Sequence, residues 1–327
     1  MVRMTVLASG SKGNSTVVSS ARTRILVDAG LSCRELFKRM QVAGEDPRTL
    51  DAILVTHEHV DHVQGLAVTA RKLGIPVYFT EATHRAWARW MTPRKRVTYA
   101  DWLEQRRQQA AAELSASAEV VDEVAEDAIQ EAAAEELAAP DCNSPEPEDD
   151  APLKVVADPA RLPGVEYFTA GEAFCVGDIA VTPFTLPHDA IDPVGFVFEA
   201  EGIRVGVATD LGYMPAHVEQ RLKRCDVLML ESNHDLDMLR DGPYPWSVKQ
   251  RVMSRVGHLS NDAAAKFLEE GYDGQAAYVV LAHLSESNNM PELARLAAER
   301  ALRDRMNLLG NRLLLATQQA PLESITL

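Results

Sequence analysis

The sequence predicts an α/β fold, because short apolar segments of strand length alternate with segments of helical periodicity along most of its 327 residues. Hydrophobic residues make up 46% of the chain and charged residues 25%, which leaves enough apolar material to bury a core. Histidine and acidic residues stand directly after several apolar segments, where α/β sheets gather functional side chains. No apolar run reaches the roughly 18 residues that a membrane-spanning helix needs, so we expect no such helix.

The first hundred residues alternate regularly between the two kinds of segment. Ser32 is a suitable N-cap for a helix that ends near Met40, and Gly74 is a suitable end for the next helix. We expect strands at 2–8, 16–19, 23–27, 52–55 and 76–79, and helices at 33–40, 63–73 and 81–90.

A second α/β series begins near Val155. Glu201 and Gly202 form a two-residue turn signal, which predicts a hairpin of the strands at 194–200 and 203–208. The other expected strands are 179–186, 225–230, 278–281 and 312–316, and the expected helices are 215–223, 245–256, 261–269 and 291–305. We therefore expect a single domain made of residues 1–100 and 155–327.

Residues 101–154 interrupt this domain with a different composition. Between Asp101 and Asp150 there are 16 acidic residues and two basic ones, so this segment carries −14 of the net charge of −15. It is rich in Ala, Glu and Gln, and we interpret it as an acidic insertion that is partly helical or disordered. A solubilising loop is the favoured role, and docking of a protein partner is the alternative. Because one segment holds the acidity, the net charge does not exclude a nucleic-acid substrate.

The motif with the clearest chemistry is His57-Glu58-His59-Val60-Asp61-His62, which directly follows an apolar segment. Three of the nine histidines of the chain fall within these six residues, an improbable cluster for an ordinary surface loop. Histidines two positions apart in a tight loop can converge on one cation, and Asp61 and His62 then turn toward a second. The HxHxDH pattern therefore predicts a metal site.

One loop cannot saturate two cations, so further ligands must come from elsewhere in the chain. His188, Asp210 and His283 each follow an apolar segment, as His57 does, and we expect all of them at the same edge of the sheet. Neutral imidazoles with few carboxylates suit Zn²⁺, Mn²⁺ or Fe²⁺ better than Mg²⁺ or Ca²⁺. Two such ions, about 3.5–4 Å apart, would share a water and convert it to hydroxide at neutral pH, which predicts a hydrolase.

The order Asp28, HxHxDH, His188, Asp210 and His283 resembles the metallo-β-lactamase fold superfamily over nearly the whole chain outside residues 101–154. Finer motifs are similar to those of the YycJ/WalJ family of DNA-processing hydrolases. These motifs are residues 9–15, 231–235, 242–246, 257–260 and 282–285, with Asn288 and Asn289. The resemblance implies a four-layer αββα sandwich. The acidic insertion departs from the pattern expected of that family.

Carried over position by position, the resemblance implies two ligand sets that share one carboxylate. The first cation would take His57, His59 and His188, the second would take Asp61, His62 and His283, and Asp210 would bridge them. Asp28 would orient the loop that carries the first ligands, with the capping of a turn as its alternative role.

The resemblance also implies a proton donor for the leaving oxygen. His258 is similar to a histidine of the phosphodiesterases in this superfamily, and Glu231 would hold its tautomer and charge. Capping of the helix that begins near Asn261 is the alternative role of His258. The catalytic set would then be Asp61, Glu231 and His258. We assign no role to three other histidines, which are His84, His217 and His234.

The loop at residues 9–15 offers hydroxyl groups, glycines and free backbone N–H groups. Ser11, Asn14 and Ser15 are therefore candidate phosphate contacts, although a tight turn between the first two strands explains the same residues. The basic clusters at 94–96 and 221–224 are candidate walls of a substrate groove.

These features together imply a dinuclear metal hydrolase that cleaves phosphodiester bonds by a shared hydroxide, and they favour a 5′-to-3′ DNA exonuclease. The nucleic-acid substrate follows from the resemblance alone, because the sequence shows no aromatic–basic stacking motif. An RNA-processing or small-molecule phosphodiesterase is one alternative, and a non-catalytic scaffold that recruits partners through residues 101–154 is another.

The scattered cysteines bear on the compartment. Cys33, Cys142, Cys175 and Cys225 form no CxxC pair, and the N-terminal residues lack the pattern of a secretory signal. We therefore expect a cytoplasmic protein with reduced thiols and no membrane association.

Overall fold

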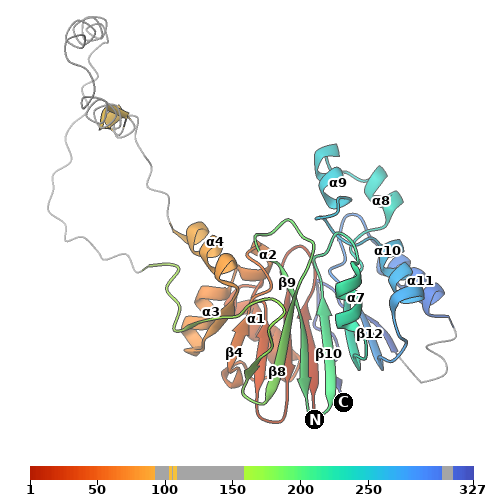
Figure 1. Cartoon of the computed structure of the whole chain (residues 1–327), viewed down its shortest axis with the longest axis horizontal. Coiled ribbons are helices and arrows are strands. Elements are labelled where there is room, and N and C mark those ends of the chain that lie inside the picture. Colours follow the sequence, from red (N-terminus) through yellow and green to blue (C-terminus); the bar gives the residue numbers. More distant parts are fainter. Residues whose placement is uncertain (93–102, 105, 109–157, 304–311) are drawn as a thin grey trace, which may run out of the picture. The chain divides into compact units, whose positions relative to one another are not determined.

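The strands of the described residues form two β-sheets, and helices lie on the outer face of each sheet (Figure 1). The computed structural model describes residues 1–92, 103–104, 106–108, 158–303 and 312–327. The expected α/β class and four-layer αββα arrangement are confirmed. Met1–Thr92 and Asp158–Leu327 form one compact unit. Almost all of residues 101–154 lie outside the described part, so the nature of the insertion stays a prediction.

The first sheet contains seven strands within the described residues. Their order is β14 (Ile325–Thr326), β1 (Arg3–Ala8), β2 (Ser15–Ser19), β3 (Arg24–Val27), β4 (Ala52–Leu54), β5 (Val77–Phe79) and β6 (Val165–Tyr167). Strands β14 to β3 pair antiparallel, and β3 to β6 pair parallel. Helices α1 (Cys33–Val42), α3 (Leu66–Leu73) and α4 (Glu81–Met91) cover the outer face, where Trp87 lies against Phe79.

The second sheet also contains seven strands in the described part of the chain. Their order is β13 (Arg312–Leu315), β12 (Tyr278–Ala282), β11 (Val227–Glu231), β10 (Ile203–Ala208), β9 (Val194–Ala200), β8 (Ile179–Thr185) and β7 (Phe174–Val176). Strands β10 to β13 run parallel. Helices α7 (Ala216–Leu222), α10 (Asn261–Lys266) and α11 (Pro291–Leu302) cover its outer face, and α8 (Leu236–Asp241) and α9 (Trp246–Val252) project beyond one end of the strands (Figure 1).

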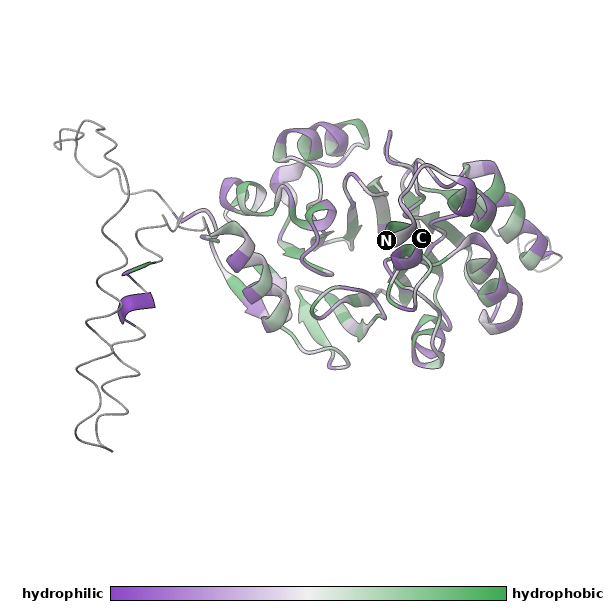
Figure 2. Ribbon diagram, turned by 90° about the horizontal axis from the view of Figure 1, so that it is seen from above, coloured by the Kyte–Doolittle hydropathy of each residue, from purple (hydrophilic) through white to green (hydrophobic). Residues whose placement is uncertain are grey.

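Apolar side chains fill the space between the sheets and the space beneath the helices. In β9, Phe196 and Phe198 belong to the cluster between the sheets, whereas Val197 belongs to the cluster under the helices, because successive strand residues face opposite sides. Strands that are buried on both faces need apolar side chains at every position. Their sequences are therefore continuous apolar runs, without alternation of apolar and polar residues. Figure 2 shows these hydrophobic strands inside the layers, with hydrophilic residues on the outer helices.

Several helices differ from the expected ranges. The structure has two helices where the sequence predicts one at 63–73. The first is α2 (Val60–Val63), and the second is α3, which begins only after Gly65. A Cβ on Gly65 would lie 2.0 Å from the carbonyl oxygen of Leu31, so only glycine fits at this junction. The helices expected at 245–256 and 291–305 end early, at Val252 and Leu302.

The sequence did not predict several short elements. These are β6, β7, β14, α8, the 3₁₀-helix Pro47–Thr49, and the π-helix Phe267–Gly271 that continues α10 where a single α-helix was expected at 261–269. Strands β6 and β7 have three residues each and are half exposed, so they carry no apolar pattern that could be recognised.

No helix within the described residues combines the length and the apolar character needed to cross a membrane. Cys33, Cys175 and Cys225 are free thiols, and Cys142 lies outside the described residues.

Candidate metal centre

Five strands of the two sheets deliver acidic and histidine side chains to one place. His57 follows β4, His188 follows β8, Asp210 follows β10 and His283 follows β12. Parallel strands end at the same edge of a sheet, so the residues just beyond them meet there. Asp28 joins them from the end of β3, and its carboxylate lies 2.7 Å from His62.

The first group of potential ligands is His57, His59 and His188, whose nitrogen atoms lie within 4.8 Å of one another. Nε2 of His188 lies 3.3 Å from Nδ1 of His59. Nδ1 of His188 lies 3.0 Å from the carbonyl oxygen of Gly257 and donates to it, so Nε2 carries a lone pair. That lone pair points toward the group, which is the tautomer that a metal ligand requires.

The second group is Asp61, His62 and His283, whose ligand atoms also lie within 4.8 Å of one another. Oδ2 of Asp61 lies 3.5 Å from Nε2 of His62 and 3.4 Å from Nε2 of His283. A histidine from the loop after β4 and a histidine from the end of β12 therefore share one carboxylate.

Asp210 lies between the two groups. Its Oδ2 is 3.4 Å from Nε2 of His62, and its Oδ1 is 3.4 Å from Nδ1 of His283. It also forms a potential metal-binding group with His57 and His62, so it contacts members of both sets. The structure thus brings together all seven residues that the sequence predicts as ligands.

Two buried atoms test whether a cation fits this arrangement. Nε2 of His57 and Oδ2 of Asp210 have no hydrogen-bond partner among the described residues, although both are buried. An orphaned buried donor or acceptor is costly unless another group satisfies it. Imidazole and carboxylate donors at these distances suit a divalent cation, so the residues fit such an ion.

Electrostatic interactions within the cluster also favour a cation. Burial lowers the pKa of His57 well below its usual value, and the neighbouring histidines lower it further, so this imidazole is neutral and able to ligate. Burial alone would raise the pKa of Asp210, but His283 and His62 hold it well below its usual range. The Asp210 carboxylate is therefore ionised. The surrounding carboxylates outweigh burial and raise the pKa of His62 well above its usual value and that of His283 to about 10, so a divalent ion would displace a proton from each of these imidazoles.

Asp28 supports the ligand loop from behind. Its carboxylate accepts hydrogen bonds from the backbone N–H and the hydroxyl of Thr56, both at 2.8 Å, and from Nδ1 of His62 at 2.7 Å. The bond to Nδ1 leaves Nε2 of His62 facing Asp61 and Asp210. Asp28 therefore fixes both the start of the HxHxDH loop and the tautomer of its last histidine.

Glu231, the last residue of β11, connects a further histidine to the cluster. Its Oε1 accepts hydrogen bonds from Nδ1 of His258 at 2.8 Å and from Nδ1 of His283 at 2.9 Å. Its Oε2 accepts from the backbone N–H groups of Leu211 and Leu259. The sequence suggested the pair with His258 but gave no sign of the contact with His283.

Three residues of the centre have backbone conformations that favour glycine. Asp28, Asp210 and His283 have φ values of 60°, 65° and 55°. Non-glycine residues are rare in this left-handed region and persist where surrounding contacts hold them. Their position at three strand ends shows that the backbone turns sharply there to aim these side chains at the centre.

The loop after β1 contributes a structural amide. Asn14 is buried, and its Nδ2 lies 3.1 Å from both Oδ2 of Asp61 and Nε2 of His62. Ser15 is also buried and donates to the carbonyl oxygen of Asn14. Of the three candidate phosphate contacts, Ser11 is the one that lines the cavity described below. A phosphate contact from this loop stays a prediction.

Three polar residues of the centre were not singled out from the sequence. The hydroxyl of Thr56 contacts Asp28 and both His57 and His62. Ser9 accepts a hydrogen bond from the backbone N–H of His283, and Asn233 donates to the carbonyl oxygen of the same residue. Ser9 and Asn233 belong to motifs that the sequence made visible, but uncharged side chains give no chemical signal of their own.

Members of both ligand groups line a cavity of about 270 Å³. These are His59, Asp61, Asp210 and His283, and His258 lines it with them. The other lining residues come from the loop after β1, from α9 and the residues just before it, and from the segments that follow β11 and β12. They include Ser11, Tyr244, Val248, Arg251, Val252, Ser285 and Asn288.

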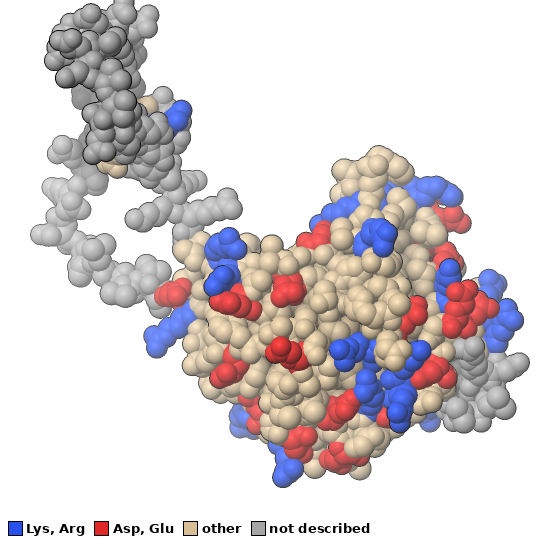
Figure 3. All heavy atoms as spheres, viewed as in Figure 1, with Lys and Arg blue, Asp and Glu red and all other residues tan. Residues whose placement is uncertain are grey.

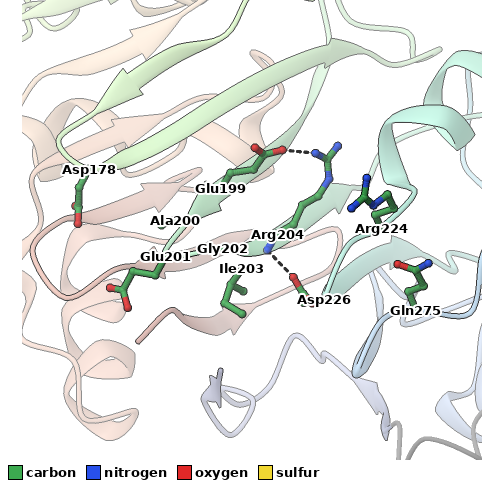
Figure 4. A pocket seen from close by; sticks show the side chains of 10 residues that line it. All are labelled: Asp178, Glu199, Ala200, Glu201, Gly202, Ile203, Arg204, Arg224, Asp226 and Gln275. Carbon is green, nitrogen blue, oxygen red and sulfur yellow. Dashed lines mark hydrogen bonds and ion pairs between the residues drawn. The ribbon is translucent and has the colours of Figure 1, made fainter.

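The basic cluster at 221–224 does not wall this cavity, contrary to expectation. Arg224 lines a different cavity, of about 650 Å³, together with Arg204 and Asp226 (Figure 4). This second cavity lies where β10 begins, whereas Asp210 follows the end of β10. The cluster at 94–96 lies outside the described residues.

The unassigned histidines lie in ordinary structural environments. His84 on α4 stacks on Phe79 and contacts the hydroxyl of Tyr167. His217 is exposed on α7. His234 is buried, and its Nδ1 has no hydrogen-bond partner among the described residues.

The fold and the ligand cluster together define a metal-dependent hydrolase with an αββα sandwich. A beta-lactamase superfamily domain matches residues 23–125 and 99–284 of this chain. The chain belongs to the metallo-β-lactamase superfamily and, within it, to the family that contains YycJ and WalJ.

Two curated relatives cover most of the chain. The exodeoxyribonuclease YycJ of Bacillus anthracis is 31% identical over 307 residues, which are 93% of this chain and 90% of the relative. The exodeoxyribonuclease WalJ of Streptococcus pneumoniae is 28% identical over 294 residues, which are 90% of this chain and 86% of the relative.

Solved structures support the fold. The metallo-β-lactamase fold protein YhfI of Bacillus subtilis has a TM-score of 0.57 at 15% identity and covers 98% of this chain and 99% of its own. The short form of human tRNase Z has a TM-score of 0.52 at 15% identity and covers 98% of both chains. These similarities confirm the αββα fold of the chain.

Proposed function

We propose that this enzyme is a dinuclear metal-dependent phosphodiesterase, and that it removes nucleotides from the 5′ end of DNA. The observation that carries the proposal is the convergence of two ligand groups on Asp210, with His258 beside them in the lining of one cavity. The DNA substrate is supported by the relatives. They are exodeoxyribonucleases, and their sequences match about nine-tenths of this chain.

In this proposal each ligand group would hold one divalent ion, which would be Zn²⁺, Mn²⁺ or Fe²⁺. The first ion would be held by His57, His59 and His188, the second by Asp61, His62 and His283, and Asp210 would serve both. Two divalent ions bound there would supply an acidified water and neutralise the phosphodiester oxygens.

His258 acts as the proton donor in this scheme. Its Nδ1 is hydrogen-bonded to Glu231, so Nε2 is the ring nitrogen left for a leaving oxygen in the cavity that His258 lines. Glu231 is ionised, because the nearby histidines overcome the effect of burial and lower its pKa to about 2. The buried carboxylate beside Nδ1 orients the imidazole, so that Nε2 can pass a proton to the leaving oxygen.

The proposal is tested by metal analysis followed by a nuclease assay that resolves strand polarity. The purified protein should contain two divalent ions per chain and shorten 5′-phosphorylated DNA, labelled at its 3′ end, from the 5′ end. His59→Ala should lose metal and activity while its circular dichroism spectrum is unchanged. His258→Ala should keep its metal and slow turnover by about 10²–10⁴-fold. His217→Ala, an exposed histidine on α7, is the matched control and should match wild type.

Other outcomes would contradict specific parts of the proposal. Equal metal loss in the His59 and His258 variants would exclude His258 as a donor outside the ligand set. Cleavage of RNA but not DNA would favour an RNA-processing phosphodiesterase. Cleavage of small phosphodiesters only would favour a small-molecule phosphodiesterase. A chain that binds no metal and cleaves nothing would favour the scaffold interpretation.

A further inference from the structure

Two uncharged residues of the loop after β1, Ser9 and Asn14, contact members of the second ligand group. Both are buried. Nδ2 of Asn14 lies 3.1 Å from Oδ2 of Asp61, and the hydroxyl oxygen of Ser9 accepts a hydrogen bond of 2.8 Å from the backbone N–H of His283. Asp61 comes after β4 of the first sheet, and His283 comes after β12 of the second. One loop therefore contacts ligands that both sheets deliver.

The backbone of the same loop fixes the orientation of the Asn14 amide. The backbone N–H of Gly10 donates to Oδ1 of Asn14 at 2.9 Å, so Nδ2 is the atom that faces Asp61. Nδ2 also lies 3.1 Å from the carbonyl oxygen of Gly10, which takes one of its two N–H groups and leaves the other for the carboxylate. Because an amide nitrogen is a donor only, Nδ2 orients a ligand and does not replace one.

Ser9 holds a ligand whose backbone needs support. His283 has a φ value of 55°, a conformation that persists in a non-glycine residue only where surrounding contacts hold it. The hydroxyl of Ser9 binds the backbone N–H of His283, and the side chain of Asn233 donates to its carbonyl oxygen at 2.8 Å. Both ends of this residue are thus fixed, and with them the direction of its imidazole.

The loop itself is anchored by the segment after β13. The backbone N–H of Ser9 donates to the carbonyl oxygen of Thr317 at 3.2 Å. The buried Gln318 accepts from the backbone N–H of Lys12 at 2.9 Å and donates to the carbonyl oxygen of Gly13 at 3.2 Å. These contacts hold the loop without any ion, so no ordering of the loop has to accompany ion binding.

The first ligand group is oriented by other residues. Nδ1 of His188 donates to the carbonyl oxygen of Gly257, and Nδ1 of His57 lies 3.0 Å from the hydroxyl of Thr56. In the described part of the chain, no hydrogen bond joins the loop after β1 to the first group. A change in this loop should therefore affect the two proposed ions unequally.

We infer that Ser9 and Asn14 are positioning residues that set the affinity of the second ion and leave the affinity of the first unchanged. Asn14 holds the carboxylate of Asp61, and Ser9 holds the backbone of His283, so that the ligand atoms of both residues face one point. The inference rests on the proposed two-ion function and deepens it, because it makes the loop after β1 the element that controls binding of the second ion.

The test measures the two affinities on the full chain with Mn²⁺ alone. Equilibrium dialysis counts the bound ions, and electron paramagnetic resonance distinguishes a coupled pair of Mn²⁺ ions from a single one. Wild type should bind two ions as a coupled pair. Asn14→Ala should weaken one ion about 10–100-fold, as for other contacts behind metal ligands, and leave the other unchanged. At intermediate Mn²⁺ this variant should therefore show the signal of a single ion.

Ser9→Ala should act in the same direction by about tenfold, because Glu231 still holds Nδ1 of His283. A ligand variant identifies the ion that is lost. His188→Ala removes a ligand of the first group and should keep one ion, whereas His188→Ala combined with Asn14→Ala should keep none at the same Mn²⁺ concentration.

Ser324→Ala is the matched control. It removes a hydroxyl that is bonded to Arg3 and Thr5 on β1, away from the ligands, and both Mn²⁺ affinities should equal those of wild type. This control, Asn14→Ala and Ser9→Ala replace neutral side chains by a neutral one. They leave the surface charges, which are of both signs and intermixed on the face shown in Figure 3, as they are. Long-range attraction of cations is therefore the same in all of them.

Two results would overturn the inference. Equal weakening of both ions by Asn14→Ala would give this residue a general structural role. Wild-type affinities in both Asn14→Ala and Ser9→Ala would show that neither residue positions a ligand. Ser9→Ala, which removes a single hydroxyl, decides the question if Asn14→Ala does not fold. A wild-type protein that binds fewer than two ions would instead count against the proposed two-ion function, so the two failures are distinguishable.

Discussion

Glu231 and His258 are joined by a hydrogen bond of 2.8 Å, although 27 residues separate them in the chain. The same carboxylate oxygen lies 2.9 Å from Nδ1 of His283, a potential metal ligand. One buried carboxylate therefore positions both the proposed proton donor and one ligand of the second group. The proposed metal site and the proposed proton donor therefore share one carboxylate.

The first prediction concerns this link. Glu231→Gln replaces the charged acceptor of Nδ1 of His258 and of Nδ1 of His283 by a neutral amide. We expect kcat to fall by about 10²-fold and metal content to fall with it, because both imidazoles lose the carboxylate that orients them. Glu199→Gln, an exposed residue paired with Arg204, is the control. A Glu231→Gln enzyme with the kcat and the metal content of wild type would contradict this role of Glu231.

The second prediction concerns the carboxylate behind the ligand loop. Asp28→Asn keeps the size of the side chain but loses an acceptor for Nδ1 of His62. We expect metal affinity to fall by about 10–100-fold, as for other carboxylates that orient ligating histidines. The measurement is competition with a chromophoric chelator. Asp46→Asn, which affects only a remote 3₁₀-helix, should bind metal as wild type does. Equal affinities of the two variants would contradict the role of Asp28.

The third prediction tests the close approach of backbones beneath the HxHxDH loop. A Cβ on Gly30 would lie 1.7 Å from the carbonyl oxygen of Asp61, so Gly30→Ala must displace that residue. We expect a loss of about 1–3 kcal/mol of unfolding free energy, together with loss of the second ion. Gly164→Ala is the control, because its Cβ would meet only Pro76 at 3.5 Å. A Gly30→Ala protein with two ions and normal stability would refute this packing.

The fourth prediction concerns the pH dependence of stability. Burial lowers the pKa of His234 from 6.5 to about 4, so this imidazole is neutral in the fold. The unfolded chain takes up a proton near pH 6.5, so His234 increasingly destabilises the fold as the pH falls from 6.5 toward 4. At pH 5 this effect amounts to about 2 kcal/mol.

His234→Gln removes this proton uptake. Urea unfolding measures the free energy of unfolding of both proteins at pH 7 and at pH 5. Between these two pH values, wild type should lose about 2 kcal/mol more of this free energy than the variant does. A His234→Gln difference that stays constant with pH would contradict a neutral buried imidazole.

The fifth prediction concerns the acidic insertion. Arg71 donates to the carbonyl oxygens of Pro159 and Arg161, both at 3.0 Å, and so holds the chain where it re-enters the folded unit. Deletion of residues 101–153, with a short linker in their place, should leave turnover within about twofold of wild type. An unfolded product would show that these residues belong to the domain and do not form an insertion.

The sequence predicted those features that depend on local pattern. Strands 194–200 and 203–208 were placed at their observed bounds, because long apolar runs joined by a glycine turn leave little ambiguity. The ligand loop was visible because three histidines and an aspartate fall within six residues. The break at Gly65 was not visible, because its cause is the carbonyl group of Leu31, far away in the sequence.

The contact between Glu231 and His283 could not be predicted for a related reason. It depends on the parallel register of β11 and β12, which pairs Glu231 with Ala282 and so places the carboxylate beside the next residue. Register across a parallel sheet is set by packing of the whole layer. The composition of either strand alone contains no information about it.

The pairing of β14 with β1 brings the two ends of the chain together (Figure 1). The backbones of Val2 and Leu327 exchange two hydrogen bonds, at 3.0 and 2.9 Å. A few glycine and serine residues would suffice to join them, so the protein is a natural candidate for circular permutation. New termini opened at the turn between β9 and β10 would lie at the end of β10 opposite to Asp210, and would leave the reaction centre undisturbed.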